Sequence, residues 1–171
     1  GKITLNELRP LNIEDILGRD EVAPDNELLQ ESIKGKTILI TGAGGSIGSE
    51  LCFQISKFSP KEIILFEQTE LFLYEIEMRI KSLFPNINIV AVVGDVRDIQ
   101  TVENIISKNK PSIIFHAAAY KHVPLMEENP GEALITNVIG TNNIASMAAK
   151  YNVPRFVLVS TDKAVNPTNV M

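Results

Sequence analysis

Short apolar runs alternate with longer segments of helical period from residue 36 onward. Apolar runs of four to six residues, rich in Ile, Val and Leu, predict five strands, at Thr37–Thr41, Glu62–Glu67, Asn88–Val93, Ser112–His116 and Arg155–Ser160. Apolar residues at helical spacing predict helices between them, at Ser46–Lys57, Thr69–Leu83, Asp98–Lys108 and Glu132–Tyr151. Because strands that are apolar on both faces need helical cover on both sides, the pattern predicts an α/β fold with a doubly wound parallel sheet.

Proline residues mark the boundaries of these elements. Four of them stand just before predicted strands, where the fixed φ of proline ends a helix: Pro60, Pro85, Pro111 and Pro154. Residues 1–35 lack this alternation and hold two short helical patches, at 12–17 and 26–34. We therefore expect an N-terminal arm over residues 1–35 and one domain over residues 36–171.

Composition narrows the class of protein. The chain has 171 residues, with 16 Lys and Arg against 21 Asp and Glu and a formal net charge of -5 at pH 7. This length suits one domain, and the acidic balance argues against nucleic acid as a partner, which needs a basic face. The single Cys52 cannot form an internal disulfide, and no Cys and His cluster indicates a metal site. No apolar run is long enough to span a membrane, so this stretch is cytoplasmic in character.

The clearest chemical motif is a glycine-rich turn between the first predicted strand and helix. Three glycines, Gly42, Gly45 and Gly48, are spaced three residues apart, with Ser46 and Ile47 before the last of them. In this context glycines allow a tight turn and close approach of the backbone to a pyrophosphate, which the helix N-terminus attracts. No Lys-Ser or Lys-Thr follows the turn, so it is not a P-loop. The turn predicts a dinucleotide site on a Rossmann-type sheet.

Two acidic residues follow later strands at positions that suit such a site. Glu67 ends the second strand, 19 residues after Gly48, where a carboxylate accepts hydrogen bonds from the adenosine ribose and repels a 2′-phosphate. No Arg or Lys lies between Phe66 and Leu73, which favours NAD over NADP. The alternative for Glu67 is a helix cap. Asp95, after the third strand, suits an adenine contact and a turn cap equally well.

Five segments resemble the nucleotide-sugar 4,6-dehydratases, a branch of the extended short-chain dehydrogenases that includes polysaccharide biosynthesis proteins of the CapD type. The segments are TGAGGSIGSELC from Thr41, GDVRD from Gly94, HAAAYKHVPLMEENP from His116, TNVIGT from Thr136 and STDKAVNPTNVM from Ser160. The resemblance implies NAD on the glycine turn and at Asp95, Val96, Ala117, Ala118, Ala119 and Lys121, with Asn137 supporting the active site. Without it, Lys121 would be read as part of a solvated loop.

The same resemblance implies the chemistry. It makes Lys163 the base at carbon 5 of the sugar, Asp162 the acid for the leaving hydroxyl at carbon 6, and Thr161 the partner of the carbon 4 hydroxyl. The implied reaction oxidises carbon 4, eliminates water across carbons 5 and 6, and returns hydride to carbon 6 of UDP-N-acetylglucosamine. Met171 stands where the wider family has its catalytic tyrosine, which is typical of the long dehydratases and argues against a 4-epimerase.

Two other functions stay open at this stage. One is a nucleotide-sugar epimerase, and the other is a dinucleotide-binding regulatory module without catalysis, because the lysine paired with the family's tyrosine and the substrate half would lie beyond residue 171. The resemblance also implies a homo-oligomer and, in the longer members, anchoring to the cytoplasmic face of the inner membrane upstream of Gly1. We expect this chain to be part of such a longer protein.

Overall fold

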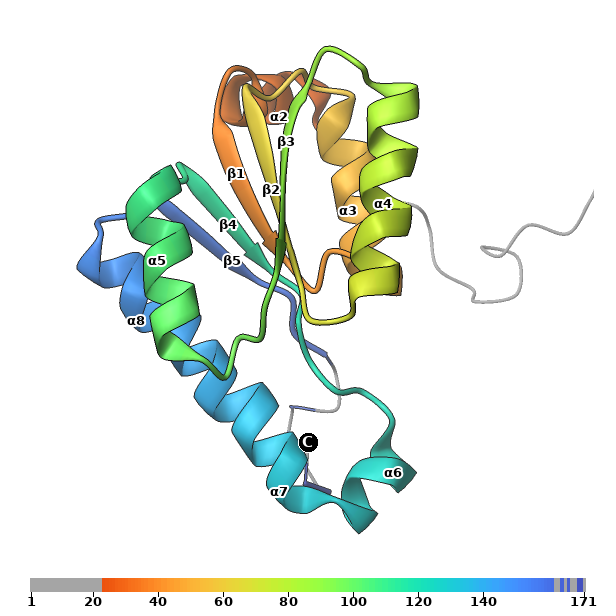
Figure 1. Ribbon diagram of the computed structural model, residues 1–171, viewed down its shortest axis with the longest axis vertical. Helices are drawn as coiled ribbons and strands as arrows, with labels where there is room; N and C mark the ends of the chain where they lie inside the picture. Colours follow the sequence, from red (N-terminus) through yellow and green to blue (C-terminus); the bar gives the residue numbers. More distant parts are fainter. Residues whose placement is uncertain (1–22, 162–163, 165, 167–168, 171) are drawn as a thin grey trace, which may run out of the picture.

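A five-stranded parallel sheet forms the centre of the molecule (Figure 1). The computed structural model describes residues 23–161, 164, 166, 169 and 170, so the predicted helical patch at 12–17 lies outside the described residues. The strands, in spatial order, are β3 (Asn88–Val93), β2 (Glu62–Glu67), β1 (Thr37–Thr41), β4 (Ile113–His116) and β5 (Arg155–Leu158). The predicted fold class is confirmed.

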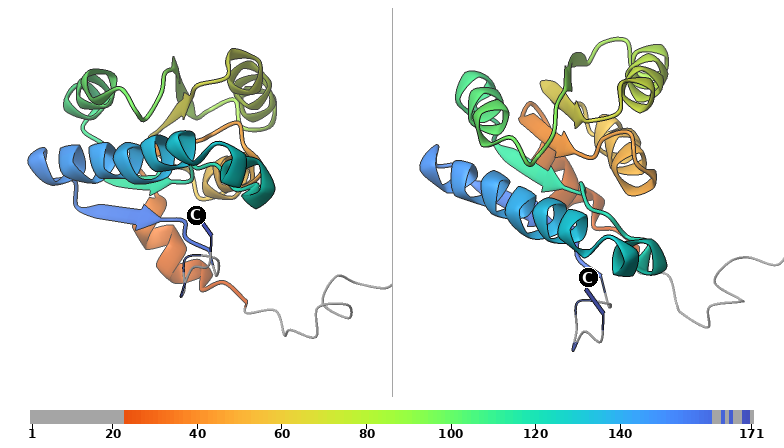
Figure 2. Two further views of the ribbon diagram at one scale, coloured as in Figure 1. Left: turned by 90° about the horizontal axis from the view of Figure 1, so that it is seen from below. Right: turned by 60° about the horizontal axis from the view of Figure 1, so that its bottom comes forward.

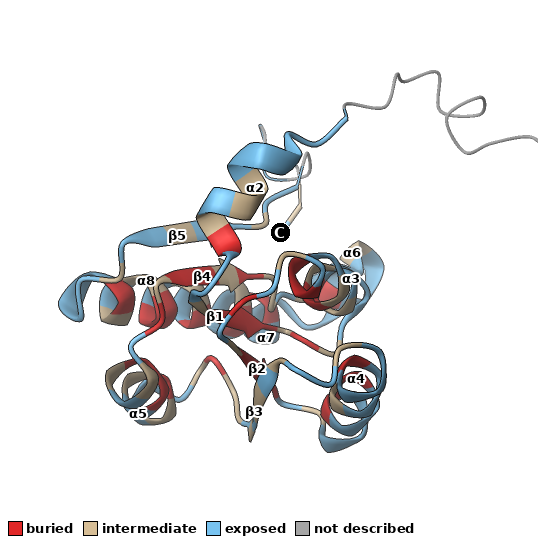
Figure 3. Ribbon diagram, turned by 90° about the horizontal axis from the view of Figure 1, so that it is seen from above, coloured by how far each residue is buried: buried red, intermediate tan, exposed pale blue. Residues whose placement is uncertain are grey.

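Helices cover both faces of this sheet, as the apolar strands require (Figure 3). On one face lie α2 (Asn26–Ile33), α3 (Ser46–Ser56) and α4 (Glu70–Leu83), and on the other lie α5 (Ile99–Asn109) and α8 (Thr141–Lys150). Because α2 buries Ile33 in the core beside α3 and α4, this part of the predicted arm packs as part of the domain.

The central strand β1 and its neighbour β2 divide their side chains between two cores. In β1, Ile38 and Ile40 pack among residues of α3 and α4, whereas Leu39 packs among residues of α5 and α8. In β2, Leu65 and Phe66 face opposite sides in the same way. This alternation follows from the two-residue period of a strand. The fully buried centre holds the ends of β1, β2 and β4 at fixed positions.

The segment between β4 and β5 departs most from its prediction. The expected single helix over 132–151 consists of α7 (Pro130–Ala133), a π-helical stretch η2 (Leu134–Gly140) and α8. Backbone angles at the junctions stay helical, so these pieces form one path with a widened turn. A further short helix, α6 (Val123–Glu128), was not predicted. The fourth strand begins one residue later than predicted, at Ile113, and the fifth ends at Leu158.

The strand order creates a crevice at the carboxyl edge of the sheet. The strand β1 pairs with β2 on one side and with β4 on the other, so the chain after β3 crosses to the opposite half of the sheet. In such sheets ligands bind where the strand order switches direction. Beyond this edge extend α6 and α7 (Figures 1 and 2).

Within the described part of the chain, no helix combines the length and apolarity that a bilayer crossing requires. The same residues contain no cluster of three His, Cys, Asp or Glu side chains that could hold a metal ion.

Candidate functional site

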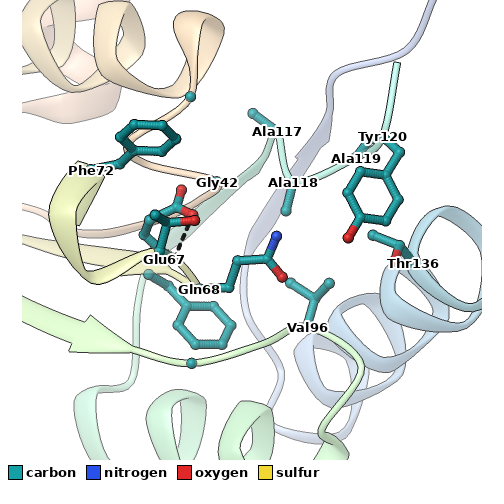
Figure 4. Close-up of a pocket in the computed structure, with 14 residues that line it drawn as sticks. Gly42, Glu67, Gln68, Phe72, Val96, Ala117, Ala118, Ala119, Tyr120 and Thr136 are labelled. Carbon is teal, nitrogen blue, oxygen red and sulfur yellow. Dashed lines mark hydrogen bonds between the residues drawn. The ribbon is translucent and has the colours of Figure 1, made fainter. Parts of the chain in front are cut away.

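A pocket lies at the switch point, bounded by the loops that follow β1, β2, β3 and β4 (Figure 4). Its lining residues are Gly42, Gly45, Phe66, Glu67, Gln68, Thr69, Phe72, Gly94, Val96, Ala117, Ala118, Ala119, Tyr120 and Thr136. None of these described lining residues is basic. The only formal charge among them is the carboxylate of Glu67, so the pocket wall is mostly apolar and backbone.

The glycine turn packs so closely against its neighbours that two of its positions have no room for a side chain. A Cβ on Gly48 would lie 1.9 Å from the carbonyl oxygen of Gly42, so α3 packs directly on the turn. Gly42 has a φ of +64°, and a Cβ there would lie 2.8 Å from the Cα of Ala118. The turn therefore closes against both α3 and the loop after β4, and it needs glycine at these two positions.

The helix α3 begins at this turn, and its first backbone N–H groups are not capped by a side chain. Its N-cap is Gly45, which provides no side-chain cap, and the first amide to bond back to the cap carbonyl is that of Ser49, at 2.8 Å. The N–H groups of Ser46, Ile47 and Gly48 have no partner within the helix, as at every uncapped N-terminus. With the helix dipole, this end favours an anion. Gly45 lines the pocket, whereas Ser46, Ile47 and Gly48, which follow it in the sequence, are not among the lining residues.

Glu67 joins two loops of the pocket. Its side chain is only 7% exposed. One carboxylate oxygen accepts the N–H of Gly44 at 3.1 Å, and the other accepts the N–H of Thr69 at 3.0 Å. The carboxylate thus fixes the glycine turn relative to the start of α4, and it keeps further lone pairs for a ligand hydroxyl.

Asp95 and Val96 occupy the loop after β3 and play different parts. Val96 is buried and lines the pocket. Asp95 accepts hydrogen bonds from the backbone N–H of Arg97, at 2.9 Å, and from its Nε, at 2.7 Å. Partial burial opposes ionisation of Asp95, but these bonds outweigh it and hold its pKa below the usual range. Arg97 also pairs with Glu132 of α7. Asp95 is therefore an internal partner of Arg97.

The three alanines after β4 form the opposite wall. Ala117, Ala118 and Ala119 all line the pocket, and small side chains there leave the backbone accessible. Tyr120 follows them, and its peptide group pairs with the amide of Asn137 on η2. The Tyr120 N–H donates to Asn137 Oδ1 at 2.9 Å, and Asn137 Nδ2 donates to the Tyr120 carbonyl at 3.0 Å. This pair of hydrogen bonds fixes the end of the alanine wall.

Thr136 lines the pocket, a position that sequence reasoning missed. The residue is 6% exposed and, like Tyr120, lines the pocket (Figure 4). Among the described residues, none forms a hydrogen bond with its Oγ1 atom. A buried polar atom without a partner is costly in a folded protein. The sequence signal that could have identified Thr136 as a site residue was its position next to Asn137 in the TNVIGT segment.

His116 connects the end of β4 to its neighbours on both sides. Its Nδ1 lies 2.6 Å from the hydroxyl of Thr41 on β1, and its Nε2 lies 2.9 Å from the hydroxyl of Thr141 on α8. Thr41 in turn accepts a long bond from the N–H of Ala118. The ring is 1% exposed, and burial lowers its pKa from 6.5 to about 4. A neutral ring, with one nitrogen donating and the other accepting, thus supports the alanine wall.

The predicted catalytic residues fall at the margin of the described structure. Thr161 is exposed beyond the end of β5, and its carbonyl accepts the N–H of Ala164 at 3.1 Å. Lys121 is exposed in the loop before α6. Asp162, Lys163 and Met171 lie outside the described residues.

Comparison with known sequences places this geometry in a family. The family described as "Polysaccharide biosynthesis protein" has a model that matches residues 38–171. The capsular polysaccharide biosynthesis protein CapD of Staphylococcus aureus is 47% identical over 172 residues, which are 100% of this chain and 29% of CapD. The chain therefore spans less than a third of that relative.

Two further relatives carry enzyme names. The UDP-N-acetylglucosamine 4,6-dehydratase (inverting) of Campylobacter jejuni is 35% identical over 137 residues, 80% of this chain and 39% of the relative. A UDP-glucose 4-epimerase of Rickettsia canadensis is 39% identical over 143 residues, again 80% of this chain and 39% of the relative. Both activities are thus present among proteins similar to this chain.

Solved structures share the fold. Pen from Bacillus thuringiensis superposes with a TM-score of 0.73 at 32% identity, over 81% of this chain and 42% of Pen. The enzyme WbmG of Bordetella bronchiseptica, solved in complex with NAD, gives a TM-score of 0.60 at 28% identity, over 73% of this chain and 37% of WbmG.

We predict that acid destabilises the fold through His116. Its pKa is 6.5 in an unfolded chain and about 4 in the fold, so between these values the unfolded chain binds more protons. Stability should therefore fall as the pH is lowered through this window, by about 3 kcal/mol in total. Urea titrations at several pH values measure this free energy of unfolding.

The matched variants are His116→Gln and His122→Gln, which replace the two histidines of the chain. The first should lose most of the pH dependence in this window, and the second, at an exposed position, should keep it. An unchanged pH dependence in His116→Gln would contradict the assignment.

Proposed function

Because the chain belongs to the polysaccharide biosynthesis protein family, we propose that it is the NAD-binding part of a nucleotide-sugar 4,6-dehydratase that acts on UDP-N-acetylglucosamine. The observation that carries this proposal is the pocket at the switch point of the sheet, which is lined by the N-cap of an uncapped helix, by a buried carboxylate and by Thr136, whose hydroxyl has no hydrogen-bond partner among the described residues. The chain spans 29% of CapD, so the activity and substrate are proposed for the longer protein.

The residues present fit a dinucleotide. The open amides at the start of α3 suit the diphosphate, and Glu67 suits the adenosine ribose because its oxygens retain free lone pairs. The alanine wall lets a flat ligand approach the backbone, and Val96 offers an apolar contact for adenine. The Thr136 hydroxyl, which has no partner among the described residues, would gain one.

The lining favours NAD over NADP. A 2′-phosphate near Glu67 would meet a carboxylate, and none of the described lining residues supplies a cation to neutralise it. NAD bound in this pocket would accept hydride from carbon 4 of the sugar and return it to carbon 6. NAD in the WbmG structure supports this assignment by similarity.

The proton transfers are assigned to the segment after β5. Lys163 would remove the proton from carbon 5 of the sugar, and Asp162 would give a proton to the hydroxyl that leaves carbon 6 as water. Thr161 would hold the carbon 4 hydroxyl. Lys121 would lie near the nicotinamide ribose or the sugar, and Asn137 would support this region through Tyr120. An adjacent amine and carboxyl can divide base and acid roles if their surroundings tune the two pKa values.

A second candidate is a nucleotide-sugar 4-epimerase, which the Rickettsia relative favours. Both reactions begin at carbon 4 and can use the same cofactor pocket. Met171, at the position of the family's tyrosine, argues for the dehydratase, because a thioether cannot act as a base.

We also propose that the longer protein assembles as a homo-oligomer. Four apolar side chains of η2 are 42% to 56% exposed on the outer face of this helix: Leu134, Ile135, Val138 and Ile139. An apolar face of this kind is typical of an interface.

We predict that Thr136→Val weakens NAD binding about tenfold, because the isosteric side chain keeps the volume and loses the hydroxyl. Thr136→Ser should retain most of the affinity. Isothermal titration of NAD into this chain measures both. Equal affinities for the valine variant and the unchanged chain would remove Thr136 from the site.

The function itself is tested with the longest natural reading frame that contains this chain. Incubated with UDP-N-acetylglucosamine and NAD in deuterated water, it should release a 4-keto-6-deoxy sugar that has lost one water and carries deuterium at carbon 5. Lys163→Met should abolish this product while leaving NAD binding intact, and Lys108→Met, on the far helix α5, should change neither. A product of unchanged mass, epimerised at carbon 4, would favour the epimerase instead.

A further inference from the structure

Asn143 is a buried polar side chain outside the pocket that donates hydrogen bonds to a pocket loop. It lies on α8, is 6% exposed, and is not among the lining residues. Its Nδ2 atom donates to the carbonyl of Val96 at 3.0 Å and to the carbonyl of Arg97 at 3.1 Å. Because both neighbours are acceptors, only the NH₂ group of the amide can face them, and its two hydrogens match the two carbonyls.

The loop that Asn143 holds forms the β3 side of the pocket. Val96 lines the pocket from this loop, and a Cβ on Gly140 would lie 2.6 Å from Val96 Cγ2, so the helix path passes close beside it. Asp95 and Arg97, which flank Val96 in the sequence, bond to each other. The carbonyls of Val96 and Arg97 both accept hydrogen bonds from Asn143. The backbone of this loop is therefore held from the side that faces α8.

We propose that Asn143 is a positioning residue, which sets the affinity for the adenosine half of a dinucleotide by fixing the loop that carries Val96. The inference rests on the proposed function for the identity of the ligand. Asn143 itself touches no ligand; it acts through the backbone of residues 96 and 97. Without its two hydrogens, both carbonyls lose a partner, and the loop turns away from the pocket to regain hydrogen bonds.

The test replaces Asn143 by the isosteric Asp, which puts an acceptor against the two carbonyls. The chain offers a matched control in Asn142→Asp, the same chemical change one residue earlier, at an exposed position whose side chain accepts a hydrogen bond from Ser146. Two quantities are measured on this chain: the dissociation constant of ADP-ribose, by titration calorimetry, and amide hydrogen exchange without ligand.

We expect Asn143→Asp to raise the dissociation constant of ADP-ribose about tenfold. It should also speed exchange at residues 95–98 more than at the central strand β1. Asn142→Asp should do neither. A merely structural role would speed exchange across the whole domain, including β1, because it would act through global unfolding.

Equal ADP-ribose affinities in the two variants, or faster exchange spread evenly over the domain, would overturn the inference. If the unchanged chain fails to bind ADP-ribose, the proposed function is wrong at its cofactor site. The exchange comparison then decides separately whether Asn143 fixes the loop, since it needs no ligand.

Discussion

The close packing of α3 on the glycine turn is the constraint on which the pocket depends. The helix can start directly at the edge of the sheet only because nothing larger than hydrogen stands between Gly48 and the carbonyl of Gly42. Moving α3 outward to admit a side chain would shift the start of this helix away from the glycine turn and from the pocket that Gly45 lines. Glu67 secures the same arrangement from the second strand, because its carboxylate accepts an N–H from the turn and another from the start of α4.

The opposite side of the pocket depends on one helical path, η2 followed by α8. It presents Asn137 to the loop after β4, Thr141 to His116, and Asn143 to the loop after β3. Each of these side chains bonds to a different part of the pocket wall or its support. A single rigid element therefore sets the distance between the adenine side and the alanine wall, while its outer face stays apolar and exposed.

Much of this architecture could be predicted from the sequence. Strands that are apolar on both faces and punctuated by proline identify a parallel sheet, and the spacing of Gly42, Gly45 and Gly48 locates the turn within it. The pattern could not predict the π-helical stretch, since η2 keeps helical periodicity and its widened turn is set by contacts with distant loops. For the same reason, the burial of the Thr136 hydroxyl and the hydrogen bonds of Asn143 could be recognised only in three dimensions. Glu67 was predicted near a ribose, but its bonds to Gly44 and Thr69 depend on how two loops meet.

The central claim is that the switch-point pocket holds NAD, and a crystal structure of this chain grown with NAD tests it most directly. The account predicts the diphosphate at the first amides of α3, the adenosine ribose beside Glu67, and adenine against Val96. NAD bound elsewhere on the chain, or absent from a fully formed pocket at saturating concentration, would contradict it.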